Sequence, residues 1–303
     1  MATAPIEPPQ RLVSSLSGDP ESPVREWLDA LPTLVQQRLE AWDLTLERVQ
    51  APGGRSSLVC LVRQKDQTPA ALKFPVPGGV FAHEGTALEA WDGWGAVRLL
   101  RSDAASGALL LERLQGGVSL RSLPEAKALL EAAGTVRRLW VPAAPEHAFE
   151  TLAGRTEEAA ETLRTAEALT PSAGPLVDRA LELRRALPDG SDERFLLHGA
   201  FRQGKVLAGE RAPWLAVGPS PVVGERAYDL AALVLDRFED LAAGAGAAAA
   251  ARRRVAKLAD SLEVDRDRLR DWTLYRAVDI GVREVAAGDR QRGELLLEFA
   301  AWL

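Results

Sequence analysis

The sequence lacks several features that would assign it to a broad class of protein. It holds a single cysteine, Cys60, which excludes an intrachain disulfide. Its formal charge is -6, and the absence of a basic excess argues against a nucleic-acid partner. No apolar run approaches the length of a membrane span, and the N-terminus "MATAPIEPPQ" has no basic region followed by an apolar one. We therefore expect a cytoplasmic protein with no membrane partner.

Changes in composition divide the chain. Residues 1–23 are rich in proline, serine and glycine, which predicts a flexible N-terminal lead-in. Residues 24–114 hold a helical pattern, which Pro32 should break or kink, and then five short strand-like runs. The helical stretch "FAHEGTALEAWDGWG" follows the third run. Cys60 lies in the second run, where we expect a core residue; a reactive thiol is the alternative.

The remainder of the chain, residues 115–303, is mostly helical in pattern, with apolar residues spaced by three and four. One brief β interlude, "FLLHGAFRQGKVL" at 195–207, interrupts it, and "PWLAVGPSP" is its expected partner strand. This order of elements predicts an α+β fold with two lobes. A small β-rich lobe carries one inserted helix, and a larger helical lobe carries a β-hairpin near the junction.

Several stretches carry a resemblance to a known family. "AALKF", "HEGTALEAWDGWGAVRLLRSDAASGALLLERL", "LLHGAFRQGKVL" and "WLAVGPSPVVGERAYDLAALV" together resemble the aminoglycoside and hydroxyurea phosphotransferases, in particular the streptomycin 6-kinase branch. The resemblance runs from about Trp27 to the C-terminus. It implies a protein-kinase-like fold, ATP as cofactor, and phosphoryl transfer to an alcohol group of an antibiotic. It also implies a link to antibiotic resistance and secondary metabolism.

The resemblance assigns a nucleotide-binding role to four residues of the first lobe. Lys73 on the third strand would hold the α- and β-phosphates and pair with Glu84 on the following helix. The alternative is that both side chains simply meet solvent. In the connector "LLLERLQGG", the backbone of Glu112 and Leu114 would contact adenine, with Leu110 or Leu111 behind the ring. The turn "APGGRSS" would cover the phosphates, although it also suits a plain hairpin.

The catalytic loop at 198–205 departs from the pattern of the family it resembles. That family has His-Gly-Asp, one residue, His, two residues and Asn, followed by a metal-binding Asp in a later strand end. The His-Gly pair at 198–199 is kept here. The base position is Ala200, the second histidine position is Arg202, the asparagine position is Lys205, and the later aspartate position is Gly218.

These changes predict the loss of catalysis. Ala200 cannot accept a proton, and general-base assistance is typically worth a factor of about 100 to 10,000. Lys205 repels a divalent cation, and Gly218 offers no side-chain oxygen. The first hypothesis is therefore a pseudokinase that binds a nucleotide, a metabolite or a protein, with ATP as a candidate ligand and no magnesium. Arg202 and Lys205 would then form an anion site; the alternative is that they point to solvent.

Two other functions stay open on the sequence alone. An active small-molecule kinase would need another carboxylate near Gly218, for which Glu225 and Asp229 are the candidates. We expect Asp229 to act structurally instead, by pairing with backbone or with Arg226. A scaffold with a collapsed cleft is the third reading, in which Arg202 or Lys205 fills the nucleotide site.

The late helical stretch "DWTLYRAVDIGVREVAAGD" supplies candidates for an acceptor site. In the family that the chain resembles, acidic and aromatic side chains in this region meet cationic sugars. Trp272, Tyr275 and Asp279, with Glu284 further on, are spaced by roughly one helical turn. The alternative is that the two aromatic residues belong to the core and the acids face solvent.

Overall fold

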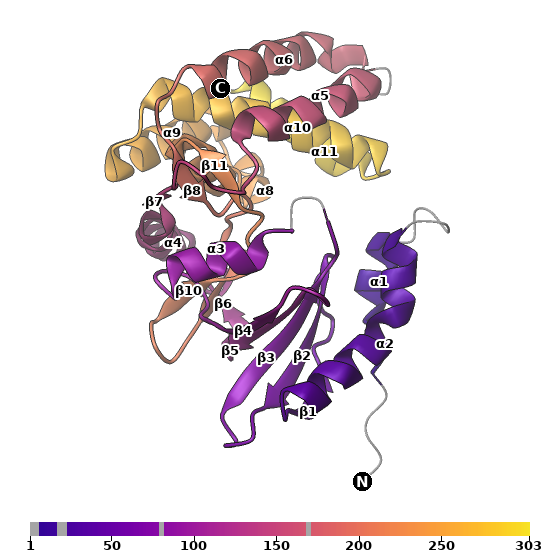
Figure 1. The fold of residues 1–303 in the computed structure, drawn as a ribbon. Helices are drawn as coiled ribbons and strands as arrows, with labels where there is room; N and C mark the ends of the chain where they lie inside the picture. The colour runs from indigo at the N-terminus through magenta and orange to yellow at the C-terminus, as the bar shows by residue number, and fades with distance from the viewer. Residues whose placement is uncertain (1–5, 17–22, 79–81, 168–170) are drawn as a thin grey trace. The chain divides into compact units, whose positions relative to one another are not determined.

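The protein is described by a computed structural model of residues 6–16, 23–78, 82–167 and 171–303. The chain forms two compact units (Figure 1). Unit 1 comprises Met1–Gly116 and Ala208–Leu215, and unit 2 comprises Gly117–Leu207 and Ala216–Leu303. The boundary expected at residue 114 falls within two residues of the observed one. The short segment Ala208–Leu215 differs from expectation, because it belongs to unit 1 although it follows the catalytic loop in sequence.

Unit 1 is built on the expected five-stranded sheet with one inserted helix. Its strand order is β1-β2-β3-β5-β4, and every neighbouring pair is antiparallel. The helix α3 (Glu84–Trp91) follows the third strand, as the sequence predicts. The five strands are β1 (Thr45–Val49), β2 (Ser57–Arg63), β3 (Pro69–Pro75), β4 (Leu99–Asp103) and β5 (Ala108–Glu112).

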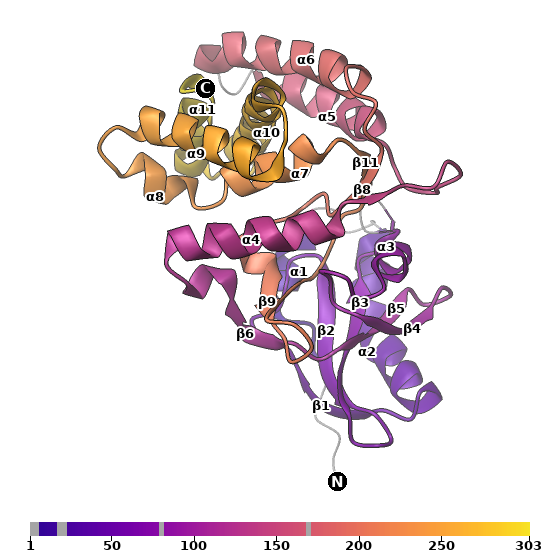
Figure 2. The ribbon, with the colours of Figure 1, turned by 90° about the vertical axis from the view of Figure 1, so that its left-hand side faces the viewer.

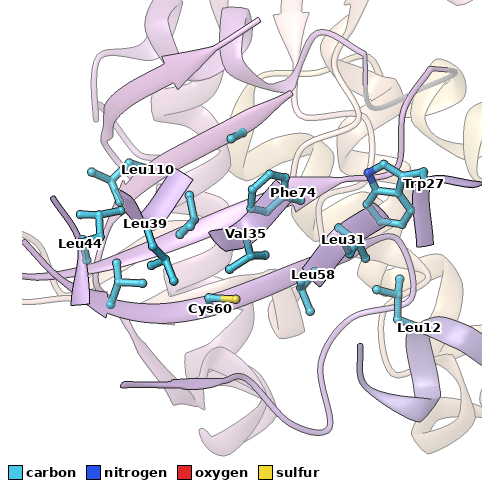
Figure 3. Packing of buried hydrophobic residues seen from close by; sticks show 14 of the residues in the cluster. Leu12, Trp27, Leu31, Val35, Leu39, Leu44, Leu58, Cys60, Phe74 and Leu110 are labelled. Carbon is cyan, nitrogen blue, oxygen red and sulfur yellow. The ribbon is translucent and has the colours of Figure 1, made fainter. Parts of the chain in front are cut away.

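Helix α2 (Pro23–Ala41) packs its apolar face on this sheet, and Pro32 lies inside the helix without ending it. The core between them is drawn in Figure 3. On β3, Leu72 and Phe74 belong to this core. Because successive strand residues point to opposite faces, Lys73 between them points away from α2. Cys60 is fully buried in the same core, and burial raises the pKa of its thiol to about 12, which excludes a reactive nucleophile.

The expected lead-in contains an ordered element. Helix α1 (Gln10–Leu16) lies within it, and Leu12 is fully buried in the core of unit 1. Ser15 Oγ also donates a hydrogen bond to the carbonyl oxygen of Arg55, at 2.6 Å. The prediction of a flexible lead-in is therefore wrong for this segment, because Leu12 is buried and Ile6 and Leu16 pack against the same core.

Leu12→Ala should lower the free energy of unfolding by about 2–5 kcal/mol, because it removes a fully buried side chain from a packed core. Arg11→Ala, an exposed position on the same helix, serves as the control and should change stability by less than about 0.5 kcal/mol. Guanidinium unfolding followed by tryptophan fluorescence measures both. Equal effects of the two variants would show that α1 does not contribute to the core.

Unit 2 is mainly helical (Figure 2). Its long helix α10 (Arg266–Ala286) buries residues along most of its length and packs against α11, α7, α6 and α5. The other helices are α4 (Glu125–Leu139), α5 (Leu152–Glu167), α6 (Gly174–Asp189), α7 (Arg226–Val234), α8 (Phe238–Ala242), α9 (Ala247–Leu262) and α11 (Arg290–Ala301), with 3-10 turns at Leu120–Ser122, Pro171–Ala173 and Gln203–Lys205.

The β interlude of unit 2 differs from a simple hairpin. Strand β8 (Phe195–Leu197) lies between β7 (Val141–Pro142) and β11 (Val222–Gly224), both antiparallel to it. The predicted partner stretch "PWLAVGPSP" contains β10 (Trp214–Ala216), which pairs with β9 (Val206–Ala208) at the end of the interlude, as expected. The strand β11, which pairs with β8, begins just after that stretch. The chain passes between the units at β6 (Gln115–Ser119), β9 (Val206–Ala208) and β10 (Trp214–Ala216). No helix in the described ranges is long and apolar enough to span a bilayer.

Candidate functional site

The predicted pair of Lys73 and Glu84 is present in unit 1. Lys73 Nζ lies 2.5 Å from Oε1 and 2.7 Å from Oε2 of Glu84. Both residues are buried, so the alternative that each meets solvent does not hold. The pair forms because Lys73 is on the face of β3 opposite α2, while Glu84 is in the first turn of α3. A buried ammonium held by both carboxylate oxygens is fixed in direction, which is what a phosphate-binding lysine needs.

The connector "LLLERLQGG", predicted to contact adenine, also has a defined structure. The backbone N–H of Glu112 donates to the carbonyl oxygen of Arg98 at 3.0 Å, and its carboxylate accepts from the backbone N–H of Arg98 at 2.7 Å. Arg211, in the segment that joins unit 1, donates to the same carboxylate at 2.7 Å. Leu114, two residues after Glu112 in the sequence, is half-buried. An adenine contact by Glu112 would therefore use its backbone carbonyl, because its N–H and its side chain have partners.

The two leucines expected behind an adenine ring lie on opposite faces of β5. Leu110 belongs to the core under α2. Leu111 points the other way by strand alternation, to the face that carries Lys73. Leu111 is therefore the candidate of the two.

The glycine turn of unit 1 is held by a contact that the sequence does not signal. Gly53 has φ +71°, and a Cβ there would lie 3.0 Å from Pro9 Cγ. Pro9 therefore lies close to Gly53, and the turn packs against the N-terminal segment. The hydrogen bond from Ser15 to Arg55 joins the same two segments. No local pattern predicts it, because the partners are about forty residues apart.

In unit 2, the start of the catalytic loop is fixed by buried hydrogen bonds. His198 is fully buried; its Nδ1 lies 3.3 Å from the backbone N–H donor of Ala200, and its Nε2 lies 3.2 Å from the carbonyl oxygen of Val217. The neutral imidazole protonated on Nε2 satisfies both contacts. The backbone N–H groups of His198 and Gly199 each donate to Asp229, at 2.7 Å. The His-Gly pair therefore has a structural role, because its backbone N–H groups and its imidazole fix the start of the loop.

Asp229 has the structural role predicted from the sequence, through backbone rather than through Arg226. It is fully buried, and that burial raises the pKa of its carboxyl, while the N–H donors of His198 and Gly199 and the charge of Arg276 oppose the rise. Arg226 pairs instead with Glu193. Both Asp229 oxygens accept N–H groups of the loop, so the role that the described contacts give this carboxylate is to hold the loop.

Glu225, the other carboxylate considered near Gly218, also accepts hydrogen bonds with both of its oxygens. Its Oε1 accepts from the indole N–H of Trp272 at 2.6 Å, and its Oε2 accepts from Arg268 Nε at 2.6 Å. Among the residues that the structure describes, no cluster of three histidine, cysteine or acidic side chains is arranged to hold a metal ion.

The two positions that matched metal ligands meet directly. Lys205 Nζ donates to the carbonyl oxygen of Gly218 at 2.7 Å, and the backbone N–H of Val217 donates to the carbonyl oxygen of Lys205 at 2.8 Å. Gly218 adopts φ +62°, which aims its carbonyl without side-chain strain. Ala200 is half-buried and Arg202 is exposed. An ammonium group thus lies between the two segments that would have to ligate magnesium.

Two arginines that stabilise this region of unit 2 were not predicted from the sequence. Arg155 donates to the carbonyl oxygens of Ser220 at 2.8 Å and Pro221 at 3.0 Å. Arg276 lies over the ring of Tyr228, 4.2 Å from its centroid, and donates to the carbonyl oxygen of the same residue at 3.3 Å. These partners are 48 to 66 residues apart, so no spacing in the sequence indicates them.

Two of the candidates for the acceptor site on α10, both aromatic, lie in the core. Trp272 is fully buried and Tyr275 nearly so, and their rings pack edge to face, 5.6 Å between centroids. Asp279 pairs with Arg283 at 2.8 Å; burial raises the pKa of its carboxyl, and the guanidinium of Arg283 opposes the rise. Glu284 lies 3.5 Å from Arg292. The two aromatic residues therefore follow the core alternative, and only Asp279 stays an acceptor-site prediction.

Comparisons with known proteins identify a family for this chain. The aminoglycoside/hydroxyurea antibiotic resistance kinase family matches residues 41–288. Streptomycin 6-kinase of Streptomyces glaucescens is 33% identical over 93% of this chain and 92% of its own length. Hydroxyurea phosphotransferase of Kitasatospora aureofaciens is 37% identical over 88% of this chain and 76% of its own length.

Solved structures resemble this fold at low sequence identity. The choline kinase LicA of Streptococcus pneumoniae superimposes with a TM-score of 0.60 at 13% identity, covering 90% of this chain and 99% of that one. A thermostable mutant of aminoglycoside phosphotransferase APH(4)-Ia in its apo form gives 0.57 at 15% identity, covering 89% and 96%. These matches establish the protein-kinase-like fold predicted from the sequence.

Proposed function

Because the chain belongs to the aminoglycoside/hydroxyurea antibiotic resistance kinase family, we propose that it is a member that has lost phosphoryl transfer and acts by binding. Its ligand would be a nucleotide, a small metabolite or a protein. The observation that carries this proposal is the contact of Lys205 Nζ with the Gly218 carbonyl oxygen, at 2.7 Å. An ammonium group in that position repels a divalent cation and takes up the carbonyl that faces it.

The missing base supports the same conclusion. Phosphoryl transfer depends on positioning, on metal ions that neutralise the phosphates, and on a group that orients the attacking hydroxyl. Ala200 cannot orient a hydroxyl by accepting its proton. Asp229 and Glu225 already accept hydrogen bonds from buried N–H groups, which hold them in their present positions.

One observation favours the second candidate, an active kinase with atypical residues. The buried pair of Lys73 and Glu84 is intact, and it matches the pair that orients phosphates in kinases. A protein that binds a nucleotide without transferring phosphate would keep the same pair. The pair therefore supports nucleotide binding in both cases and does not decide between them.

The purified protein should transfer no phosphate from ATP in the presence of magnesium. Streptomycin and hydroxyurea are the acceptors to test, because the relatives are named for them. Labelled phosphate in the acceptor measures transfer, with a streptomycin 6-kinase as positive control. Transfer by the unaltered chain that disappears in Lys73→Ala would overturn the proposal.

The triple variant Ala200→Asp, Lys205→Asn, Gly218→Asp tests the cause of the inactivity. It should gain a magnesium-dependent thermal shift with ATP, since it restores a base and two oxygen ligands. Aspartate tolerates the positive φ at 218 better than most residues do. Ala200→Asp alone is the matched control and should show no magnesium dependence, because Lys205 remains.

A further inference from the structure

The hairpin formed by β9 and β10 has a buried base and an exposed tip. In its strands, Val206, Leu215 and Ala216 are almost fully buried. The hairpin tip, residues 209–213, forms no regular secondary structure, and most of its residues are exposed. Burial therefore fixes the two strands, while the tip has little apolar surface to hold it and depends on contacts of another kind.

Charged contacts of Arg211 hold the hairpin tip on unit 1. Its Nη2 donates to Glu112 Oε1 at 2.7 Å and to the carbonyl oxygen of Ala96 at 3.0 Å, and its Nε donates to Glu112 Oε2 at 3.3 Å. The side chains of Arg211 and Glu112 are 30% and 20% exposed. Water and dissolved ions can therefore compete for the pair, which a fully buried pair would not allow.

The contact is possible because position 93 is a glycine. Gly93 has φ +77°, and a Cβ there would lie 3.0 Å from Arg211 Nη2 and 3.2 Å from Arg98 Nε. The backbone N–H of Arg98 also donates to Glu112 Oε1, at 2.7 Å. Two guanidinium groups thus approach the same point, and the repulsion between them opposes the hold of Glu112 on Arg211.

The hairpin tip also contacts the connector. A Cβ on Gly209 would lie 3.1 Å from Leu114 Cδ2, so the backbone of the tip packs directly on that side chain. Glu112 and Leu114 lie just before the first boundary between the units, and Arg211 lies between the two later boundaries. The tip therefore fastens together two chain segments that each lead from one unit to the other.

We propose that the hairpin tip is a reversible strap, which Arg211 holds closed on the connector and which opens when the pair with Glu112 breaks. The buried strands β9 and β10 stay in place when it opens. The connector then loses its contacts with the tip and gains conformational freedom where the chain leaves unit 1. Ionic strength controls the strap, because salt screens a partly exposed ion pair. The inference is independent of whether the protein transfers phosphate.

A spin label on the tip measures the opening. Cys60 is the only cysteine and is fully buried, so a thiol-reactive label attaches selectively to an introduced Glu210→Cys at an exposed position. Electron paramagnetic resonance of the whole protein then gives the ratio of mobile to immobile label. The same label on Ala105→Cys, in the exposed turn between β4 and β5, reports any general loosening of unit 1.

Arg211→Met should raise the ratio of mobile to immobile label at position 210 about tenfold, as expected for the loss of a charge-assisted pair that is partly exposed. Arg25→Met, which removes the exposed pair of Arg25 with Asp29 in the same unit, is the matched control and should leave the ratio unchanged. An unchanged ratio in Arg211→Met, an equal rise in Arg25→Met, or an equal rise at position 105 would overturn the proposal.

Gly93→Ala tests the strap with Arg211 and Glu112 intact. Its methyl group should displace the Arg211 guanidinium and mobilise the label at position 210. Gly107→Ala is the matched control, because Gly107 also has a positive φ, +68°, but a Cβ there meets no atom within 4 Å. Equal label mobility in the two variants would show that backbone strain, and not the contact with Arg211, governs the tip. Circular dichroism confirms that each variant is folded.

A salt titration tests the strap without altering its contacts. About 1 M sodium chloride, which screens charges beyond about 3 Å, should mobilise the label at position 210 when Arg211 is present and have little effect in Arg211→Met. The label at position 105 should not respond. A tip that is insensitive to salt, or that responds equally in Arg211→Met, would overturn the role of the ion pair.

Discussion

Gly199→Ala should prevent stable folding of unit 2, although it adds a single methyl group. Gly199 adopts φ +73°, and an added Cβ would lie 1.8 Å from the carbonyl oxygen of Ser220 and 2.8 Å from Arg155 Nη1. A backbone oxygen cannot move aside as a flexible side chain can. Relieving the clash would break the bonds of Arg155 to Ser220 and Pro221. We expect a loss of more than about 4 kcal/mol in the free energy of unfolding.

Gly246→Ala is the matched control for this prediction. Gly246 also has φ +73°, but an added Cβ there meets no atom within 4 Å. Its cost is the left-handed backbone alone, about 1–2 kcal/mol. Guanidinium unfolding or the yield of soluble protein measures the difference. Equal costs for the two variants would show that backbone conformation, and not the contact with Ser220, requires glycine at 199.

Asp229→Ala should be the second severe change, lowering the free energy of unfolding by about 2–5 kcal/mol. The variant leaves the buried N–H groups of His198 and Gly199 without their acceptor. Asp178→Ala, an exposed position on α6, is the control and should be nearly neutral. Hydrogen exchange gives a local readout, because the amides of residues 198 and 199 should lose protection in Asp229→Ala only. Unchanged protection there would show that the carboxylate does not hold the loop.

Asp229→Asn should remove a dependence of stability on pH. Burial raises the pKa of Asp229 in the folded state, so its contribution to stability is larger when it is protonated and falls as the pH rises from the unfolded pKa through the folded one. An asparagine has no such dependence. The stability difference between the unaltered protein and Asp229→Asn should therefore be largest in acid and shrink as the pH rises. A difference that grows with pH would contradict the raised pKa.

The sequence predicts the β-rich lobe well because its signals are local. Short runs of strand-like composition, separated by turn-rich stretches, predict all five strands of unit 1, and the family resemblance predicts the pair of Lys73 and Glu84. The family resemblance also identifies the three altered positions of the loop and the fourth at Gly218. Local patterns fail for the lead-in, since the docking of Leu12 depends on a core formed by α2 and the sheet.

Contacts between distant segments account for the rest of the candidate site. The partners of Arg155 and Asp229 lie about thirty to sixty-six residues away, and burial decides them. The same holds for Trp272, whose indole N–H reaches Glu225 across 47 residues. Helical spacing alone makes Trp272 and Tyr275 equally suitable for a ligand surface and for a core; only the packing of α10 against its neighbours separates the two.

The bond between Lys205 and the Gly218 carbonyl has a consequence for the ancestry of such a chain. Gly218→Asp alone would place a carboxylate beside an ammonium, which favours an ion pair over a metal site. Lys205→Asn alone would leave a single oxygen ligand opposite a glycine. Neither single substitution would supply two oxygen ligands for magnesium. On the proposed function, a return to catalysis would therefore require at least two substitutions together.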